Sequence, residues 1–196
     1  MPIIVDARGK ACPQPVILTQ KALAESLDVI TIVDNETSRY NVSRMAEKRG
    51  LKVHIEEKQD GTYLHITQGE SALQPASQPQ KVQPAGPLVI LIGADTLGRG
   101  DDTLGGVLMR SFLHTLGETE SPPDTLIFIN SGVKLVVSAS PVLEDLQALH
   151  NGGVQILACG TCLGHYGLKE RVAVGEISNM YTIVETMLAA SKVLRM

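Results

Sequence analysis

The sequence of 196 residues contains no tryptophan, and aromatic residues make up only 3% of it. Its net charge of -4 at pH 7 leaves no excess of basic residues. Nucleic-acid binding usually needs a basic surface for the phosphates and, for single strands, aromatic side chains on which bases stack. We therefore expect that the chain binds no nucleic acid directly.

Long hydrophobic runs are also missing. No apolar stretch approaches the ~18 residues of a membrane-spanning helix, and residues 1–6 lack the basic start and apolar core of a signal peptide. The three cysteines are an odd number, which does not suit a complete disulfide framework. We expect a cytoplasmic protein with no membrane partner, whose thiols stay reduced.

Proline is concentrated in one place. Four of the ten prolines lie between residues 68 and 87, among Gln, Ala, Ser and Gly and with almost no large apolar side chain. Such a composition cannot form a packed core. It predicts a Pro/Gln-rich linker at 70–87, between a first domain at 1–69 and a second at 88–196.

The first domain alternates between strand-like and helix-like patterns. The expected elements are strands at 3–5 and 29–33, helices at 13–27 and 37–49, and strands at 51–57 and 62–67. Gly50 suits the end of the second helix, and Asp60-Gly61 is a hairpin signal between the last two strands. The pattern therefore predicts the order βαβαββ.

The second domain contains short apolar runs typical of parallel strands that are covered on both faces. The expected strands are 88–92, 126–129 and 154–157, and the expected helices are 102–116, 141–149 and 180–188. This alternation predicts a doubly wound parallel-sheet α/β/α domain. The helix at 102–116 is apolar almost all round, which favours a homo-oligomer formed through the C-terminal domain.

Cys12 stands at the expected transition from strand to helix, before Pro13 and Pro15. Proline suits the first turn of a helix, so Pro13 is expected as the first helical residue and Cys12 as the N-cap. Unpaired backbone N–H groups and the cations of Arg8 and Lys10 would then favour the thiolate. The pattern predicts a depressed pKa and a reactive Cys12 rather than a buried, inert cysteine.

The same segment contains a motif of six residues: Asp6, Arg8, Gly9, Cys12, Pro13 and Pro15. It resembles the signature of the SirA/TusA family of small sulfur carriers. The resemblance implies a two-layer βαβαββ domain in which Cys12 carries sulfur as a persulfide and passes it to a partner. Asp6, Arg8, Pro13 and Pro15 would support Cys12 in this role.

A second thiol site follows the last expected strand, as Cys159-Gly160-Thr161-Cys162. Both cysteines should lie at the carboxyl edge of the sheet, where open α/β folds bind ligands. Three functional interpretations stay open. The pair is a redox dithiol, a zinc site to which His165 would add a third ligand, or a persulfide acceptor. In the last case His165 would take a proton from a thiol or support the thiolate as a cation. A purely structural pair is the fourth possibility.

The second domain resembles the DsrE/DsrF-type sulfur-relay proteins, and this resemblance implies that Cys159 binds sulfur and that the chain forms homo-oligomers. The whole chain resembles the YedF-type proteins, which join a SirA/TusA-like domain to a DsrE-like one and are associated with selenium metabolism. The motifs that carry this resemblance are Leu97-Gly98-x-Gly100-Asp101, Leu104-Gly105, Leu108-Met109, Asn130-x-Gly132-Val133, Cys159-Gly160-Thr161-Cys162-Leu163, Val174-Gly175 and Asn179-Met180-Tyr181.

These observations predict a sulfurtransferase-like carrier that moves sulfur or selenium between cysteine thiolates, in selenium metabolism or thiolation. Cys12 and Cys159 would each carry the chalcogen, and Cys162 would resolve or share it. The partners would be a donor such as a cysteine desulfurase and a downstream acceptor protein, and neither a cofactor nor a metal is required. The alternatives are a thiol–disulfide oxidoreductase that uses Cys159 and Cys162, and a non-catalytic regulatory or scaffold module.

Overall fold

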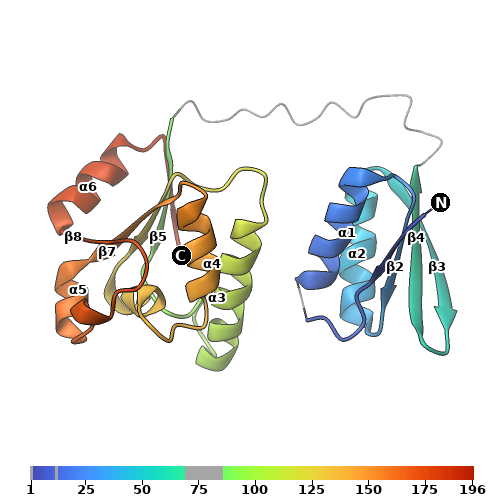
Figure 1. Ribbon diagram of the computed structural model, residues 1–196, viewed down its shortest axis with the longest axis horizontal. Helices are drawn as coiled ribbons and strands as arrows, with labels where there is room; N and C mark the ends of the chain where they lie inside the picture. Colours follow the sequence, from blue (N-terminus) through green and yellow to red (C-terminus); the bar gives the residue numbers. More distant parts are fainter. Residues whose placement is uncertain (1, 12, 69–85) are drawn as a thin grey trace. The chain divides into compact units, whose positions relative to one another are not determined.

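The computed structural model describes residues 2–11, 13–68 and 86–196 (Figure 1). The chain divides into two compact units, Met1–Lys81 and Val82–Met196. This division falls inside the expected Pro/Gln-rich linker. Because residues 69–85 lie outside the described residues, the exact limits of the linker stay a prediction.

The first unit is a four-stranded sheet with two helices on one face (Figure 1). Its elements are β1 (Ile3–Asp6), α1 (Gln14–Glu25), β2 (Val29–Val33), α2 (Glu36–Lys48), β3 (Leu51–Lys58) and β4 (Gly61–Gln68). The strand order is β1-β2-β4-β3, in which β1 and β2 are parallel and the other pairs are antiparallel. This arrangement confirms the predicted two-layer βαβαββ domain.

Local signals and a small apolar core explain these elements. The side chain of Asn35 caps α2 by accepting a 2.8 Å hydrogen bond from Ser38 N–H, and Gly50 ends the helix at a positive φ of 73°. Between the helices and the sheet, Val42, Leu64 and other apolar side chains are completely buried. Each large apolar side chain buried in this way contributes roughly 1.5–3 kcal/mol.

The second unit contains five parallel strands. Its elements are β5 (Leu88–Ile92), α3 (Asp102–Gly117), β6 (Thr125–Phe128), the 3-10 helix η1 (Asn130–Val136), α4 (Leu143–Asn151), β7 (Gln155–Cys159), α5 (Gly160–His165), the 3-10 helix η2 (Lys169–Arg171), β8 (Glu176–Ser178), α6 (Met180–Ala189) and β9 (Lys192–Arg195). The strand order is β8-β7-β6-β5-β9.

This strand order explains why the helices cover both faces of the sheet. The crossovers from β5 to β6 and from β6 to β7 step in one direction, whereas the crossover from β8 to β9 steps back across the sheet. Right-handed crossovers therefore place α3 and α4 on one face and α6 on the other, as Figure 1 shows. The predicted doubly wound α/β/α domain is confirmed.

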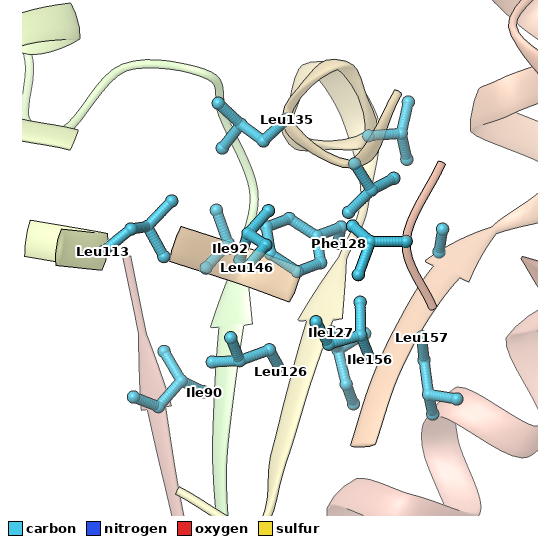
Figure 2. Close-up of a cluster of buried hydrophobic side chains, with 14 of the residues drawn as sticks. Ile90, Ile92, Leu113, Leu126, Ile127, Phe128, Leu135, Leu146, Ile156 and Leu157 are labelled. Atoms are coloured by element: carbon cyan, nitrogen blue, oxygen red, sulfur yellow. The ribbon is translucent and has the colours of Figure 1, made fainter. Parts of the chain in front are cut away.

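The core of the second unit lies between the strands and the helices. Figure 2 shows Phe128 of β6 near Ile92 of β5 and Leu146 of α4, and all three side chains are completely buried. Within the described residues, no helix combines the length and the apolar character that are needed to cross a membrane.

Helix α3 is less buried than its apolar sequence suggests. Asp101 caps it by accepting a 2.7 Å hydrogen bond from Leu104 N–H. On the outer face, the side chains of Leu104, Val107 and Leu108 are 56%, 44% and 43% exposed. The second unit therefore buries only one side of α3 and leaves the apolar side chains on its other side exposed.

Candidate thiol sites

The first motif begins where β1 ends, and it is dominated by an ion-pair cluster around Arg8. The guanidinium of Arg8 donates two hydrogen bonds to the Asp6 carboxylate in a bidentate arrangement, at 2.7 and 2.9 Å. It donates a third hydrogen bond, at 2.9 Å, to the Asp60 carboxylate. These bonds from Arg8 hold the pKa of Asp6 at about 2. Two carboxylates thus already pair with Arg8, which was expected to act as a cation beside Cys12.

Asp34 fixes the turn that follows Arg8. Gly9 has a φ of 69°, a region that glycine adopts readily, and its N–H donates a 2.6 Å hydrogen bond to the Asp34 carboxylate. This bond and a second one from Asn35 lower the pKa of Asp34. Hydrogen bonds therefore hold the segment before Cys12 against the end of β2, through Asp34, and against the β3–β4 hairpin, through Asp60. Asp6 and Arg8 thus stabilise the conformation of the motif.

Helix α1 begins one residue later than the sequence predicts. It starts at Gln14 with Pro13 at the N-cap position, and Pro15 occupies the first turn, where it removes no helical hydrogen bond. The expectations that Pro13 is the first helical residue and that Cys12 is the N-cap are therefore both wrong by one position. Cys12 itself lies outside the described residues, so its role stays a prediction.

The second thiol site lies at the carboxyl end of β7, as predicted. Cys159 is the last residue of that strand and is only 1% exposed, whereas Cys162, in the short helix α5, is half-buried. A Cβ on Gly160 would approach Ile177 Cγ2 to 3.1 Å and Ser178 O to 3.2 Å. The glycine between the strand and the helix therefore lets α5 start close against β8. Both thiols are free.

A main-chain donor from the neighbouring strand end reaches the second thiol. The N–H of Asn130, directly after β6 and Ile129, donates a 3.0 Å hydrogen bond to Cys162 Sγ. Asn130 has a left-handed φ of 50°, which asparagine tolerates better than most residues. A Cβ on Gly132 would lie 2.5 Å from Ile92 O, so only glycine lets η1 pack this closely against the end of β5.

A polar network continues from Asn130 to the loop after β5. The Tyr166 hydroxyl donates a 3.3 Å hydrogen bond to the side-chain oxygen of Asn130, and the Lys134 ammonium lies 5.1 Å from the centre of the Tyr166 ring. Lys134 also pairs with Asp95 at 3.2 Å. Burial opposes ionisation of Asp95, but bonds from Ser131 and Lys134 prevail and lower its pKa. Residues at the ends of β5, β6 and β7 thus meet.

The surroundings of Cys162 favour its neutral form. Burial raises the pKa of the Cys162 thiol, and so do the hydrogen bond and the charge of Cys159, while the Asn130 N–H acts in the opposite direction. A lowering of the pKa by a helix dipole and local cations, of the kind expected at Cys12, does not prevail at Cys162. Helix α5 has only six residues, and the Lys134 cation is paired with Asp95.

His165 does not complete a metal site. Its exposed ring packs edge-on against Tyr166, with the ring centres 4.9 Å apart. In the part of the chain that the structure describes, no three His, Cys, Asp or Glu side chains come together as metal ligands. The zinc interpretation of Cys159, Cys162 and His165 therefore has no geometric support among these residues.

Sequence reasoning found the two cysteines of this site but missed Lys134, Tyr166 and Asp95. Asn130 and Asn179 both stand in the motifs that carry the resemblance to the YedF-type proteins. The structure separates the two asparagines. Asn179 caps α6 by accepting a 3.1 Å hydrogen bond from Thr182 N–H, whereas Asn130 supports Cys162.

The fold and these residues define a class of protein: a two-domain thiol protein whose α/β/α unit has two free cysteines at the carboxyl edge of its sheet. Residues 3–68 match the family described as sulfurtransferase TusA, and residues 109–196 match the DsrE/DsrF-like family. The chain therefore joins a TusA domain to a DsrE/DsrF-like domain, which fits the architecture that the YedF-like motifs predicted. Both families are sulfur-carrier or sulfur-relay domains.

Three solved structures are similar to parts of the chain. A SirA-like protein from Desulfitobacterium hafniense is 41% identical, covering 35% of this chain and 99% of its own, with a TM-score of 0.32. The YchN protein from E. coli is 20% identical, covering 57% and 99%, with a TM-score of 0.46. A protein of unknown function from Methanobacterium thermoautotrophicum is 23% identical, covering 56% and 97%, with a TM-score of 0.40. No curated protein matches the chain.

Proposed function

We propose that the chain relays sulfur or selenium as a persulfide-type group, carried on Cys12 in the first unit and on the Cys159–Cys162 pair in the second. The proposal is supported by the presence of two sulfur-carrier domains in one chain. Its main structural support is the 3.0 Å hydrogen bond from Asn130 N–H to Cys162 Sγ, because this donor can stabilise a sulfur anion at the edge of the sheet.

The chemistry needs only thiols and persulfides. A thiolate attacks the outer sulfur of the donor persulfide, a new S–S bond forms, the old S–S bond breaks, and the donor leaves as a thiolate. Sulfur changes carrier without any net oxidation, so no cofactor takes part. The same exchange run in reverse unloads the carrier.

The two cysteines of the second unit differ in solvent exposure, and this difference suggests a separate role for each of them. Cys159 was expected to be the sulfur-binding residue, yet it is only 1% exposed. Cys162 is half-buried and is therefore the better placed to receive sulfur first, with Cys159 behind it to share or resolve the persulfide. A raised pKa also makes the Cys162 thiolate a slow leaving group, which favours retention of the bound sulfur until an acceptor arrives.

The same features disfavour the alternative of a thiol–disulfide oxidoreductase. Enzymes of that kind attack with an accessible cysteine whose pKa is lowered. Here the first cysteine of the pair, Cys159, is buried, and the pKa of the second, Cys162, is raised. The carrier function therefore fits this pair better than disulfide reduction does.

The partners in this proposal are a sulfur or selenium donor, such as a cysteine desulfurase, and an acceptor protein in selenium metabolism or thiolation. The second unit would also associate with copies of itself. The exposed apolar side chains of Leu104, Val107 and Leu108 on α3 support a homo-oligomer, because a contiguous apolar face is stabilised when a partner covers it.

The proposal is tested by loading the reduced full-length chain with a cysteine desulfurase and cysteine, followed by intact and peptide mass spectrometry. We expect adducts of about 32 Da, the mass of one sulfur, on Cys12 and Cys162. The Cys12→Ser and Cys162→Ser variants should each lose the adduct at the changed position, and a reaction without desulfurase is the control. A chain that accepts no sulfur but forms a reversible Cys159–Cys162 disulfide between about -270 and -120 mV would instead be an oxidoreductase. A chain with neither property would be a non-catalytic module.

A further inference from the structure

A surface hollow of about 350 Å³ lies beside the second thiol site. Its polar lining comes from Lys134, Ser138, Ser140, Tyr166 and Arg171, and apolar side chains complete its wall. Tyr166 N–H donates to Cys162 O at 3.1 Å, so the hollow begins one helical turn from the thiol. Cys162 does not itself line the hollow, but side chains four residues apart on a helix are about 5–6 Å apart at Cβ, so Cys162 is a near neighbour of the Tyr166 side chain in its wall.

The charge of the hollow is positive. Lys134 and Arg171 line it, and none of the described carboxylates is part of its lining. Arg171 donates to the side-chain and main-chain oxygens of Ser138, at 3.4 and 3.2 Å, and no ion pair to Arg171 occurs within the described residues. Lys134 shares its charge with Asp95. The guanidinium of Arg171 is therefore available to an anionic ligand.

The walls of the hollow are held in place before any ligand binds. Ser138 N–H donates a 2.8 Å hydrogen bond to Arg171 O, and a β-bridge joins Val137 to Val172. The next residue, Ala139, has a left-handed φ of 68°, a conformation that is unfavourable for alanine. Such strain persists only where the surroundings impose it. The backbone hydrogen bond from Ser138 N–H to Arg171 O holds the residue directly before Ala139 in place.

We propose that this hollow binds the carboxylate of a low-molecular-weight thiol that exchanges sulfur with Cys162; this inference rests on the proposed function. The volume lies at the lower end of the range of small-molecule sites, about 300–1,000 Å³. The guanidinium of Arg171 pairs with the carboxylate of the ligand, and the apolar side chains that line the hollow contact its carbon chain. The thiol of the ligand points along α5 toward Cys162. In the exchange, the bound thiolate takes the outer sulfur from the Cys162 persulfide, and Cys162 leaves as a thiolate.

Binding is tested first with probes that cannot exchange sulfur. The probes are 3-(methylthio)propanoate and its neutral analogue 3-(methylthio)propan-1-ol, titrated into the full-length chain and followed by the amide NMR signals of Ser138 and Tyr166. We expect the carboxylate to bind at least fivefold more tightly than the alcohol. Arg171→Gln should remove this preference, whereas Arg110→Gln, on α3 and outside the hollow, should keep it. Equal binding of the two probes, or a preference that survives Arg171→Gln, would overturn the proposal.

Transfer is tested separately with reactive thiols. The wild-type chain is loaded with sulfur and discharged with 3-mercaptopropionate or 3-mercaptopropan-1-ol, and the loss of persulfide from the Cys162 peptide is measured. We expect Arg171→Gln to raise KM for the carboxylate thiol about fivefold without changing kcat, and to leave the alcohol unaffected. Discharge that shows no preference for the carboxylate overturns the hollow as a substrate site while the relay stands. Carboxylate binding without any sulfur loading keeps the binding site and refutes the relay.

Discussion

Replacing Gly132 with alanine should destabilise the second unit and loosen the support of Cys162. The added Cβ would lie 2.5 Å from Ile92 O and 3.2 Å from Ile92 C, where an ordinary contact is at least 3.4 Å. The atom in the way is backbone in a central strand, so η1 must move outward by several tenths of an ångström. Overpacking of this kind costs about 1–3 kcal/mol.

Because Asn130 is the first residue of η1, the same movement should lengthen its hydrogen bond to Cys162. The matched control is Gly106→Ala on α3, where the new Cβ meets only Arg110 Nη1 at 3.8 Å. Alanine exceeds glycine in helix propensity, so this control should gain up to about 1 kcal/mol.

Thermal unfolding should therefore move in opposite directions for the two variants. A loss of 1 kcal/mol lowers Tm by about 4 °C in a unit of this size, so Gly132→Ala should unfold roughly 4–12 °C lower. The rate at which Cys162 is alkylated should also change in Gly132→Ala, and it should stay unchanged in Gly106→Ala. An equal effect of both substitutions, or a Gly132→Ala chain as stable as the parent, would refute the packing argument.

Three further predictions follow from single contacts. Arg8 holds the pKa of Asp6 at about 2, so the stability that Asp6 contributes is complete above about pH 4 and is lost as the pH falls toward 2. NMR titration of the Asp6 carboxyl carbon should show a midpoint at about pH 2. Arg8→Gln should return this midpoint toward 3.8. Cys159→Ala removes a neighbour that raises the pKa of Cys162, so Cys162 should react faster with iodoacetamide at pH 7.5, and a slower reaction would contradict the assignment. Asp101→Ala removes the α3 cap and should lower the free energy of unfolding by about 1 kcal/mol in urea, whereas an unchanged midpoint would show that the cap contributes little.

The elements with a buried apolar pattern could be predicted closely from the sequence. The strands β2 and β5 have the same bounds as the runs at 29–33 and 88–92, because nearly all their side chains are apolar and most of their residues are buried. The short strands β8 and β9 were missed. Most of their residues are exposed, so no apolar periodicity marks them, and their strand conformation comes from pairing with β7 and β5.

The candidate site was predictable in its chemistry but not in its surroundings. Cysteine spacing and the preceding apolar run were enough to place Cys159 and Cys162 at the sheet edge. The donor to Cys162 is a backbone N–H, which every residue except proline has, so no sequence pattern identifies Asn130 as its source. The burial that raises the pKa of Cys162 likewise depends on how η1 and α5 pack.

The central claim, a relay between the two units, is tested most directly by following a single sulfur through the chain. The wild-type chain is loaded by a desulfurase with less than one equivalent of sulfur, and the persulfide on each cysteine peptide is measured over time. The account predicts that sulfur appears first on one of Cys12 and Cys162 and then moves to the other, and that substituting the first site by serine leaves the second unlabelled. If both cysteines are labelled equally and independently in every variant, the two domains are separate carriers and the relay is refuted.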